Sequence, residues 1–462
     1  MKKIAMLFML FCSFAMSSQE IVGDWSGTLK TQGMELRLVF HISEANNIHS
    51  GTLDSPDQKA FGIPISSINL KNSKITISLD KLRAIYNGTL GDSGIIIGTF
   101  NQGGQSFKLN LSKDKLTERV LERPQEPKKP FPYYSEDVTF LSEGGSVKLS
   151  GTLTLPSKNG KFPVAILISG SGPQNRDEEY MTHKPFLVLS DYLTRKGIAV
   201  LRYDDRGFGE STGNHNTATS LDFAFDVKCA INYLRTRDEI NKNQIGLIGH
   251  SEGGLIAPIV ASEMEEVDFM VLLAGPGVSG SEVVLQQLKA TAELNKMTSE
   301  ELEGETEFLK GIIKILSREN KNVFKRQQLK TYFKSQLSEL DDINGMNKAE
   351  YIDSNIAQLM RPWYLYYIKH EPSKYLKQVK CPVFAINGSK DSQVVPENLN
   401  FIESALKVGG NKDVTIKEYE EMNHLFQKCE TGAISEYASI SITMDSQVLD
   451  DISKWILKMV NE

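Results

Sequence analysis

Gly249-His250-Ser251-Glu252-Gly253 is the stretch that decides the fold of this 462-residue chain. Its pattern, G-x-S-x-G, is typical of a nucleophile elbow, a tight strand-to-helix turn that holds a strained serine at its tip. Glycines are needed there because a side chain beside the serine would collide with the backbone of the turn. An apolar run precedes the stretch at residues 244–248, and small apolar residues follow at 254–261. This context predicts a strand, an elbow and a helix with Ser251 as nucleophile; a Gly-rich loop with a buried serine is the alternative.

Short apolar strands alternate with helical stretches from about residue 135 onward. After a first hairpin, strands are predicted at residues 164–168, 198–203, 245–248, 269–273, 383–387 and 414–419. A helix is predicted at residues 222–234, where apolar residues recur on one face. This alternation predicts an α/β fold, in which helices cover both faces of a mostly parallel sheet.

A segment at about residues 278–372 interrupts the alternation and is helical, charged and poor in strands. Amphipathic helices are predicted at residues 282–297 and 300–316. An insert of this length between two strands is expected to form a cap over a pocket. The aromatic cluster at residues 361–368 either lines that pocket or packs in the core of the cap, and the pattern favours neither.

The catalytic base can be sought among the histidines, because a serine hydroxyl needs a base that is itself oriented by an acid. Around an elbow of this type the chain order is Ser, then Asp or Glu, then His. Of the seven histidines, only His370 and His424 follow Ser251. His370 ends the helical insert, whereas His424 follows the last predicted strand and leaves room for an acid between. We therefore predict His424 as the base, with a plain surface-loop histidine as the alternative.

The orienting acid is expected just after strand 383–387, where Asp391 follows a Gly-Ser-Lys turn. Its carboxylate would hold the imidazole in the correct tautomer and stabilise the imidazolium that forms. The alternative is that Asp391 is an Asx-type turn residue. Glu397 is the fallback acid, although its position suits the start of the next helix better.

The oxyanion of an acyl-transfer reaction needs two backbone N–H donors. One is expected from Glu252, the residue after the nucleophile, and the other from the glycine-rich loop after strand 164–168. Within that loop we predict the N–H of Ser171, because its flanking glycines let the backbone bend toward a substrate carbonyl. Residues 202–211, which alternate charges and glycines, are expected to form a tight turn tied by Asp–Arg pairing rather than a substrate loop.

Taken together, the motifs resemble the α/β-hydrolase superfamily, in particular an exported esterase-like branch related to acyl-peptidase and dipeptidyl-peptidase catalytic domains. The residues that carry the resemblance, all within residues 136–462, are Gly170-Ser171-Gly172-Pro173-Gln174, Arg176-Asp177-Glu178, residues 204–211 and 249–254, Asp391 and His424. The resemblance implies hydrolysis of a carboxylic ester through an acyl-enzyme, with no metal and no organic cofactor. One departure is Ser169, where many relatives have histidine; the backbone donors are unaffected.

Residues 20–118 have the short alternating runs and frequent glycines of an all-β domain, which we expect to be a small antiparallel barrel or sandwich. Its opening pattern, G-x-W-x-G-x-L at residues 23–29, resembles β-domains, some lipocalin-like, that precede hydrolase domains in exported bacterial proteins. Such a domain would serve for docking or as a passive structural module. A proline-rich linker is predicted at residues 119–134, and the α/β domain at 135–462.

The N-terminus has the features of a signal peptide at residues 1–17. Lys2 and Lys3 form a positive segment, and a short apolar run and a small-x-small site ending at Ser17 follow. A lipid anchor on Cys12 is less well supported because bulky Phe11 precedes it. We therefore expect export to the periplasm or the medium; a buried N-terminal helix is the alternative.

Composition narrows the class of partner. The net charge of −6 without a dominant basic stripe argues against nucleic acid as a partner. The N-terminal apolar run is too short to span a bilayer as a helix, and no other segment is long and apolar enough to cross a membrane. The three further cysteines, Cys229, Cys381 and Cys429, are too few for a disulfide framework, so packing roles are expected.

Three functional hypotheses follow. The first is a secreted carboxylesterase that cleaves small acyl esters with a Ser251–Asp391–His424 triad. The second is a serine peptidase of the acyl-peptidase or dipeptidyl-peptidase type. It would need a cluster of acidic groups to hold a substrate amine, for which Glu252 or residues of the Arg176-Asp177-Glu178 loop could be recruited. The third is a catalytically silent binding protein in which the β-domain does the work, and the intact Ser, Asp and His set argues against it.

Overall fold

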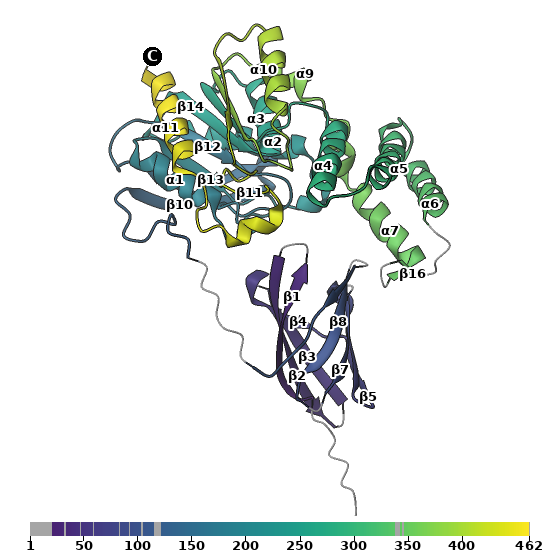
Figure 1. Cartoon of the computed structure of the whole chain (residues 1–462). Coiled ribbons are helices and arrows are strands. Elements are labelled where there is room, and N and C mark those ends of the chain that lie inside the picture. The colour runs from purple at the N-terminus through teal and green to yellow at the C-terminus, as the bar shows by residue number, and fades with distance from the viewer. Residues whose placement is uncertain are drawn as a thin grey trace, which may run out of the picture. The chain divides into compact units, whose positions relative to one another are not determined.

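The structure, a computed structural model, describes most of the chain between residues 21 and 461 (Figure 1). The described ranges are 21–31, 34–46, 48–58, 60–82, 84–91, 93–102, 105–114, 122–337, 342–343 and 346–461. The predicted signal peptide lies outside them. The chain divides into two compact units, whose sequence boundary falls between residues 118 and 119.

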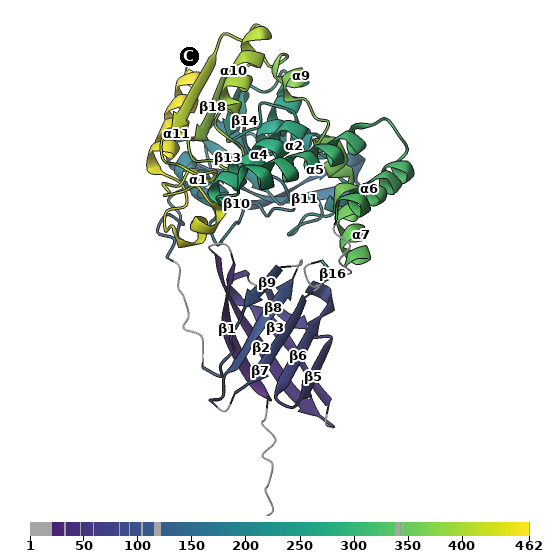
Figure 2. The ribbon, with the colours of Figure 1, turned by 45° about the vertical axis from the view of Figure 1, so that its right-hand side comes forward.

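The N-terminal unit consists of two antiparallel sheets (Figure 2). Their strands are β1 (Gly23–Thr31), β2 (Met34–Ala45), β3 (Ile48–Ser55) and β4 (Ala60–Pro64), then β5 (Ser67–Lys71), β6 (Lys74–Leu79), β7 (Ala84–Leu90), β8 (Ile96–Gln102) and β9 (Gln105–Lys108). Trp25, Phe40 and Tyr86 are buried in the core between these strands. Gly27 marks a close approach, because a Cβ there would lie 2.3 Å from the carbonyl oxygen of Asn110. The predicted antiparallel β-structure is confirmed.

The second unit contains an eight-stranded sheet in the order β10-β11-β13-β12-β14-β15-β18-β19. The strands are β10 (Tyr134–Ser142), β11 (Val147–Leu155), β12 (Phe162–Ile168), β13 (Ala199–Tyr203), β14 (Ile240–His250), β15 (Phe269–Leu273), β18 (Val383–Gly388) and β19 (Val414–Tyr419). Strand β11 pairs antiparallel with both β10 and β13. The remaining neighbours in the sheet, from β13 through β12, β14, β15 and β18 to β19, pair in parallel.

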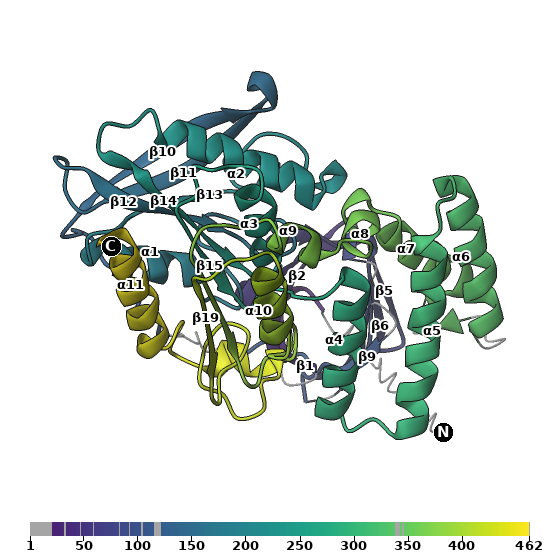
Figure 3. The ribbon, with the colours of Figure 1, turned by 90° about the horizontal axis from the view of Figure 1, so that it is seen from above.

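Helices cover both faces of this sheet (Figure 3). Helices α2 (Ser220–Leu234), α3 (Gly253–Ala261) and α10 (Asn398–Val408) bury apolar residues on one face, and α1 (Pro185–Arg195) and α11 (Ser446–Asn461) do so on the other. The α/β fold predicted from the alternating pattern is therefore confirmed. Because parallel strands end at one edge, the loops after β12, β14 and β18 meet there, which positions the site.

Helices α4 to α9 separate β15 from β18 and form the segment expected as a cap. They are α4 (Gly280–Leu294), α5 (Ser299–Ser317), α6 (Asn322–Gln336), α7 (Lys348–Leu359), α8 (Pro362–Tyr367) and α9 (Pro372–Leu376). A small core of their own, which includes Leu316, Leu329 and Ile356, holds α5, α6 and α7 together. The predicted end of α4 at Met297 is three residues late, because Lys296 has a φ of 54° and α5 begins at a capping box on Thr298.

The described part of the linker packs on the α/β unit. Arg123 donates to the carbonyl oxygens of Met181 and Ala438, and Gln125 accepts from the backbone N–H groups of Thr443 and Met444. From residue 122 the segment is therefore anchored by hydrogen bonds. No helix among the described residues combines the length and apolar character needed to span a bilayer.

Candidate active site

Ser251 lies at the predicted elbow, between the end of β14 and the start of α3. Its φ of 52° is in the left-handed region, which is strained for a serine. The flanking glycines are required by packing: a Cβ on Gly249 would lie 2.1 Å from the carbonyl oxygen of Gly253, and a Cβ on Gly253 would lie 2.1 Å from that of Ile168. The strained turn is thus held by contacts that admit no side chain.

Asp391 and His424 form a buried pair on the neighbouring loops, after β18 and β19. His424 Nδ1 lies 2.7 Å from Asp391 Oδ2, and both residues are at most 4% exposed. The other oxygen, Oδ1, accepts from the backbone N–H groups of Gln393 and Val394. Both carboxylate oxygens are therefore engaged, and Nδ1 of His424 must be the donor, which leaves Nε2 free to accept a proton.

Ser251 is connected to the Asp391–His424 pair through its neighbour in the chain, His250. The ring of His250 lies 4.7 Å from the ring of His424, and its Nε2 donates to the His424 carbonyl oxygen at 3.0 Å. The structure thus brings the strand end that carries Ser251 against the loop of His424, and joins His424 directly to Asp391. The catalytic roles assigned to the three residues stay predictions.

The loop after β12 lies against the elbow, as the oxyanion hypothesis requires. A Cβ on Gly170 would lie 3.2 Å from the Ser251 Cβ. Within the described part of the chain, no protein acceptor pairs with the backbone N–H of Ser171 or of Glu252. Two unpaired donors beside a strained serine are what an oxyanion hole needs.

Carboxylates hold this oxyanion loop, residues 169–178, in place. Asp205 accepts from the Ser169 hydroxyl at 2.8 Å and from the Gln174 N–H at 2.9 Å. Burial of its carboxyl group raises the pKa of Asp205 to about 8. Asp204 binds the backbone and guanidinium of Arg176. Arg202 pairs with Asp177 of the same loop, and Arg206 pairs with Asp226 of α2. The Asp–Arg pairs of residues 202–211 therefore join this turn to the oxyanion loop and to α2, rather than closing the turn on itself as expected.

The pairing of His250 with Glu178 is the part of the site that sequence reasoning missed. His250 Nδ1 lies 2.9 Å from Glu178 Oε1, which also accepts from the Gly170 N–H at 2.7 Å. His250 fills an unspecified position of the G-x-S-x-G pattern, and its partner stands 72 residues earlier. No spacing rule connects the two, so only the folded chain reveals the pair.

The cap contacts the elbow through α8. Trp363 Nε1 donates to Glu252 Oε1 at 2.7 Å, and the Ser220 hydroxyl donates to the same oxygen at 2.6 Å. Trp363 stacks on Tyr367, and both pack against the core of the sheet, whereas Tyr364 packs against the core of the cap. The aromatic cluster therefore bridges the two cores.

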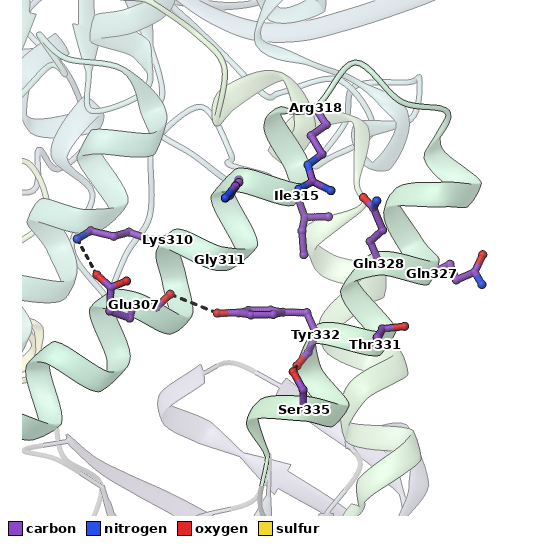
Figure 4. Close-up of a pocket in the computed structure, with 11 residues that line it drawn as sticks. Glu307, Lys310, Gly311, Ile315, Arg318, Gln327, Gln328, Thr331, Tyr332 and Ser335 are labelled. Carbon is purple, nitrogen blue, oxygen red and sulfur yellow. Dashed lines mark hydrogen bonds and ion pairs between the residues drawn. The ribbon is translucent and has the colours of Figure 1, made fainter.

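A polar groove of about 690 Å³ lies between α5 and α6, away from this edge (Figure 4). Its lining includes Lys310 and Lys314 from α5, Arg318 directly after α5, and Gln328 and Thr331 from α6. None of the predicted catalytic residues lines it. Nor do the described residues place three or more His, Cys, Asp or Glu side chains where they would hold a metal ion.

Comparisons with known proteins agree with this architecture. A family model described as serine aminopeptidase, S33, matches residues 184–428. Esterase EstD of Thermotoga maritima is 24% identical over 377 residues, which cover 81% of this chain and 80% of that protein. An uncharacterized 31.7 kDa protein of Escherichia coli is 26% identical over 302 residues, 64% of this chain and 93% of its own. Among solved structures, the Pyrococcus furiosus esterase Pf2001 aligns with a TM-score of 0.44 at 17% identity, over 75% of this chain and 98% of its own.

Proposed function

Because the chain belongs to the serine aminopeptidase S33 family of α/β hydrolases, we propose that it is a carboxylesterase that cleaves small acyl esters through an acyl-enzyme on Ser251. The observation that carries the proposal is the buried Asp391–His424 pair at 2.7 Å, beside the elbow serine and two unpaired backbone N–H groups. The name of the similar Thermotoga maritima esterase supports the ester as substrate.

In this mechanism Ser251 Oγ attacks the acyl carbon while Nε2 of His424 takes its proton. Asp391 keeps the Nδ1–H tautomer and stabilises the imidazolium. The N–H groups of Ser171 and Glu252 bind the oxyanion, and one such donor typically contributes about 3 kcal/mol to transition-state stabilisation. His424 then protonates the departing alcohol, and a water molecule activated by the same base releases the acid.

An aminopeptidase is the second candidate, because the matching family model is described by that activity. It would need a carboxylate to hold the substrate ammonium group. In two carboxylates beside the elbow, Oε1 is already engaged: that of Glu252 by Ser220 and Trp363, and that of Glu178 by His250 and Gly170. Glu178 Oε2 has no hydrogen-bond partner among the described residues, but it is buried. This occupation favours the ester over the amino-terminal peptide.

A panel of short-chain nitrophenyl esters and aminoacyl anilides tests the proposal on the wild type and Ser251→Ala. We expect turnover of the esters, and a loss on the order of 10⁴-fold or more in the variant. Ser171→Ala is the matched control, since it keeps the backbone N–H and should retain most of the activity. Full activity in Ser251→Ala would disprove the assignment of the nucleophile, and turnover of anilides alone would favour the aminopeptidase.

Export is also proposed, on the basis of the positive and apolar segments in residues 1–17. The enzyme for the panel can be prepared from the extracytoplasmic fraction of expressing cells. There we expect a mature chain that starts at Ser18. An active enzyme found only in the cytoplasm, with residues 1–17 retained, would overturn this part of the proposal.

A further inference from the structure

His250 and Glu178 form a buried pair directly behind the proposed triad. His250 is 6% exposed and Glu178 is 3% exposed. One oxygen of Glu178, Oε1, lies 2.9 Å from His250 Nδ1 and 2.7 Å from the Gly170 nitrogen. The opposite ring nitrogen of His250 lies 3.0 Å from the His424 carbonyl oxygen. The pair therefore connects the oxyanion loop, residues 169–178, to the loop of the catalytic base.

The connection between the two loops requires a particular number of protons on His250 and Glu178. The His424 carbonyl oxygen only accepts, so Nε2 of His250 must carry a hydrogen. The Gly170 N–H only donates, so Oε1 of Glu178 must accept it. The bond between His250 Nδ1 and Oε1 then needs one further proton, shared by the imidazole and the carboxyl group. All three contacts are made only when the pair holds that proton, as an imidazolium facing a carboxylate or as a neutral imidazole facing a carboxylic acid.

The surroundings favour that charged form. Burial by itself would lower the pKa of His250, but the Glu178 carboxylate and the His424 carbonyl outweigh burial, and the net pKa is raised. Asp391 adds to the attraction. Within the described chain the second oxygen of Glu178, Oε2, has no hydrogen-bond partner, so every contact of this carboxylate goes through Oε1.

A neutral replacement of either member can keep only some of these contacts. In Glu178→Gln, an amide oxygen toward Gly170 needs His250 protonated on Nδ1, which in a neutral ring removes the donor to His424. An amide nitrogen in the same place accepts nothing from Gly170. In either case one of the two loops loses its tether, although the shape of the side chain is almost unchanged.

We propose that Glu178 and His250 act together as a positioning pair that fixes the oxyanion loop and the catalytic base relative to each other, which rests on the function proposed above. They touch neither the substrate nor the serine oxygen in this role. Their effect is on the distance and angle between the oxyanion donors and His424 during the chemical step.

The test compares Glu178→Gln, His250→Gln and the double variant with the wild type, by ester kinetics and by the rate at which a fluorophosphonate labels Ser251. We expect each single variant to lose on the order of 10²-fold in kcat, since displacements of about 1 Å cost that much, while KM changes by less than about threefold. The double variant should lose no more than either single variant, because the residues act as a unit. Additive losses, or a change in KM alone, would overturn the proposal.

His370→Gln is the matched control for loss of a buried histidine. His370 is 4% exposed and bonds to the Tyr366 hydroxyl in the cap, where burial lowers the pKa of His370 to about 4. This variant should lose stability, measured by thermal unfolding, and keep its kcat. If Glu178→Gln behaves in the same way, the pair is only structural. Absence of both turnover and labelling in the wild type would instead contradict the proposed function.

The pH profile supplies an independent readout. Glu178, Asp391 and the His424 carbonyl are the groups that hold the proton on His250, so wild-type kcat should fall as rising pH removes it. Because the pKa of His250 is raised, this fall belongs on the alkaline side of the ordinary histidine range. His250→Gln should be slow throughout and lack that alkaline fall. An unchanged alkaline limb in His250→Gln would count against the pair.

Discussion

The catalytic edge of the sheet and the α5–α6 groove differ in how they treat polar side chains. At the edge, Asp391, His424 and Glu252 are each less than 5% exposed and bonded to named partners. In the groove, Lys314 and Arg318 are exposed to solvent around an open space of about 690 Å³. No predicted catalytic residue lines this space, so we do not expect the chemistry to take place there.

This difference shows what identifies a reactive site. Burying a charged group is unfavourable unless the fold supplies partners, so a cluster of buried, fully bonded carboxylates and histidines must be specified by the chain. Solvated lysines on a helix face need no such specification. We therefore expect isosteric changes at the catalytic edge of the sheet to have large effects on activity or stability, and changes of charge in the α5–α6 groove to have small ones.

The largest effect is expected from Asp391→Asn. Oδ1 accepts two backbone N–H groups, so the amide oxygen must take that position and the amide nitrogen must face His424. His424 is then forced into the tautomer with hydrogen on Nε2, which cannot accept the serine proton. We expect a fall in kcat on the order of 10⁴-fold with a folded protein, checked by ester kinetics and circular dichroism. A fall of less than tenfold would mean that another acid, such as Glu397, orients the base.

The parts of the candidate site that depend on short sequence patterns and on the order of the strands could be predicted from the sequence. The elbow requires a strand, two glycines and a helix within about 20 residues, so its pattern is visible in the sequence. The edge of a parallel sheet then limits the acid and the base to the loops after later strands. The positions of Asp391 and His424 follow from strand order alone, because each comes directly after a recognisable apolar run.

The rest was hidden because it depends on side chains that meet only in the folded protein. Trp363 and Glu252 stand 111 residues apart, and Glu178 and His250 stand 72 apart. The sequence places Trp363 in an aromatic cluster of the helical insert without saying which core it joins. The later helices of the cap, α6 and α7, were not predicted individually, although they share a core with α5. The apolar signal of α6 is weak, because Leu329 and Phe333 are its buried apolar residues.

A moderate effect is expected from Trp363→Phe, which removes the indole N–H from Glu252. Burial raises the pKa of Glu252 above its ordinary 4.5, and the bonds from Ser220 and Trp363 oppose that rise. The variant should lose about 1–3 kcal/mol of stability when the carboxylate is charged, and less at low pH, where the raised pKa leaves it protonated. Denaturant unfolding at pH 4, below the ordinary value, and at pH 8 measures the difference.

Trp455→Phe provides the control for that variant, since its indole N–H bonds to the neutral Thr415 hydroxyl. Its loss of stability should not depend on pH in this range. A several-fold fall in kcat is expected for Trp363→Phe alone, because the Glu252 N–H is a proposed oxyanion donor. Equal kcat values for the two variants would mean that the bond from Trp363 of the cap does not position the Glu252 N–H of the elbow.

The smallest effect is expected from Lys314→Gln and Arg318→Gln in the groove. Both residues are exposed and line the groove, Lys314 on α5 and Arg318 directly after it, and no predicted catalytic residue lies among the lining residues (Figure 4). Removal of a solvated charge there should change stability by less than about 0.5 kcal/mol, and kcat/KM for neutral short-chain esters by less than about twofold. If instead kcat/KM fell tenfold, substrate would have to pass through the groove. The volume of a cavity would then indicate the functional region of this protein better than its buried, hydrogen-bonded polar groups do.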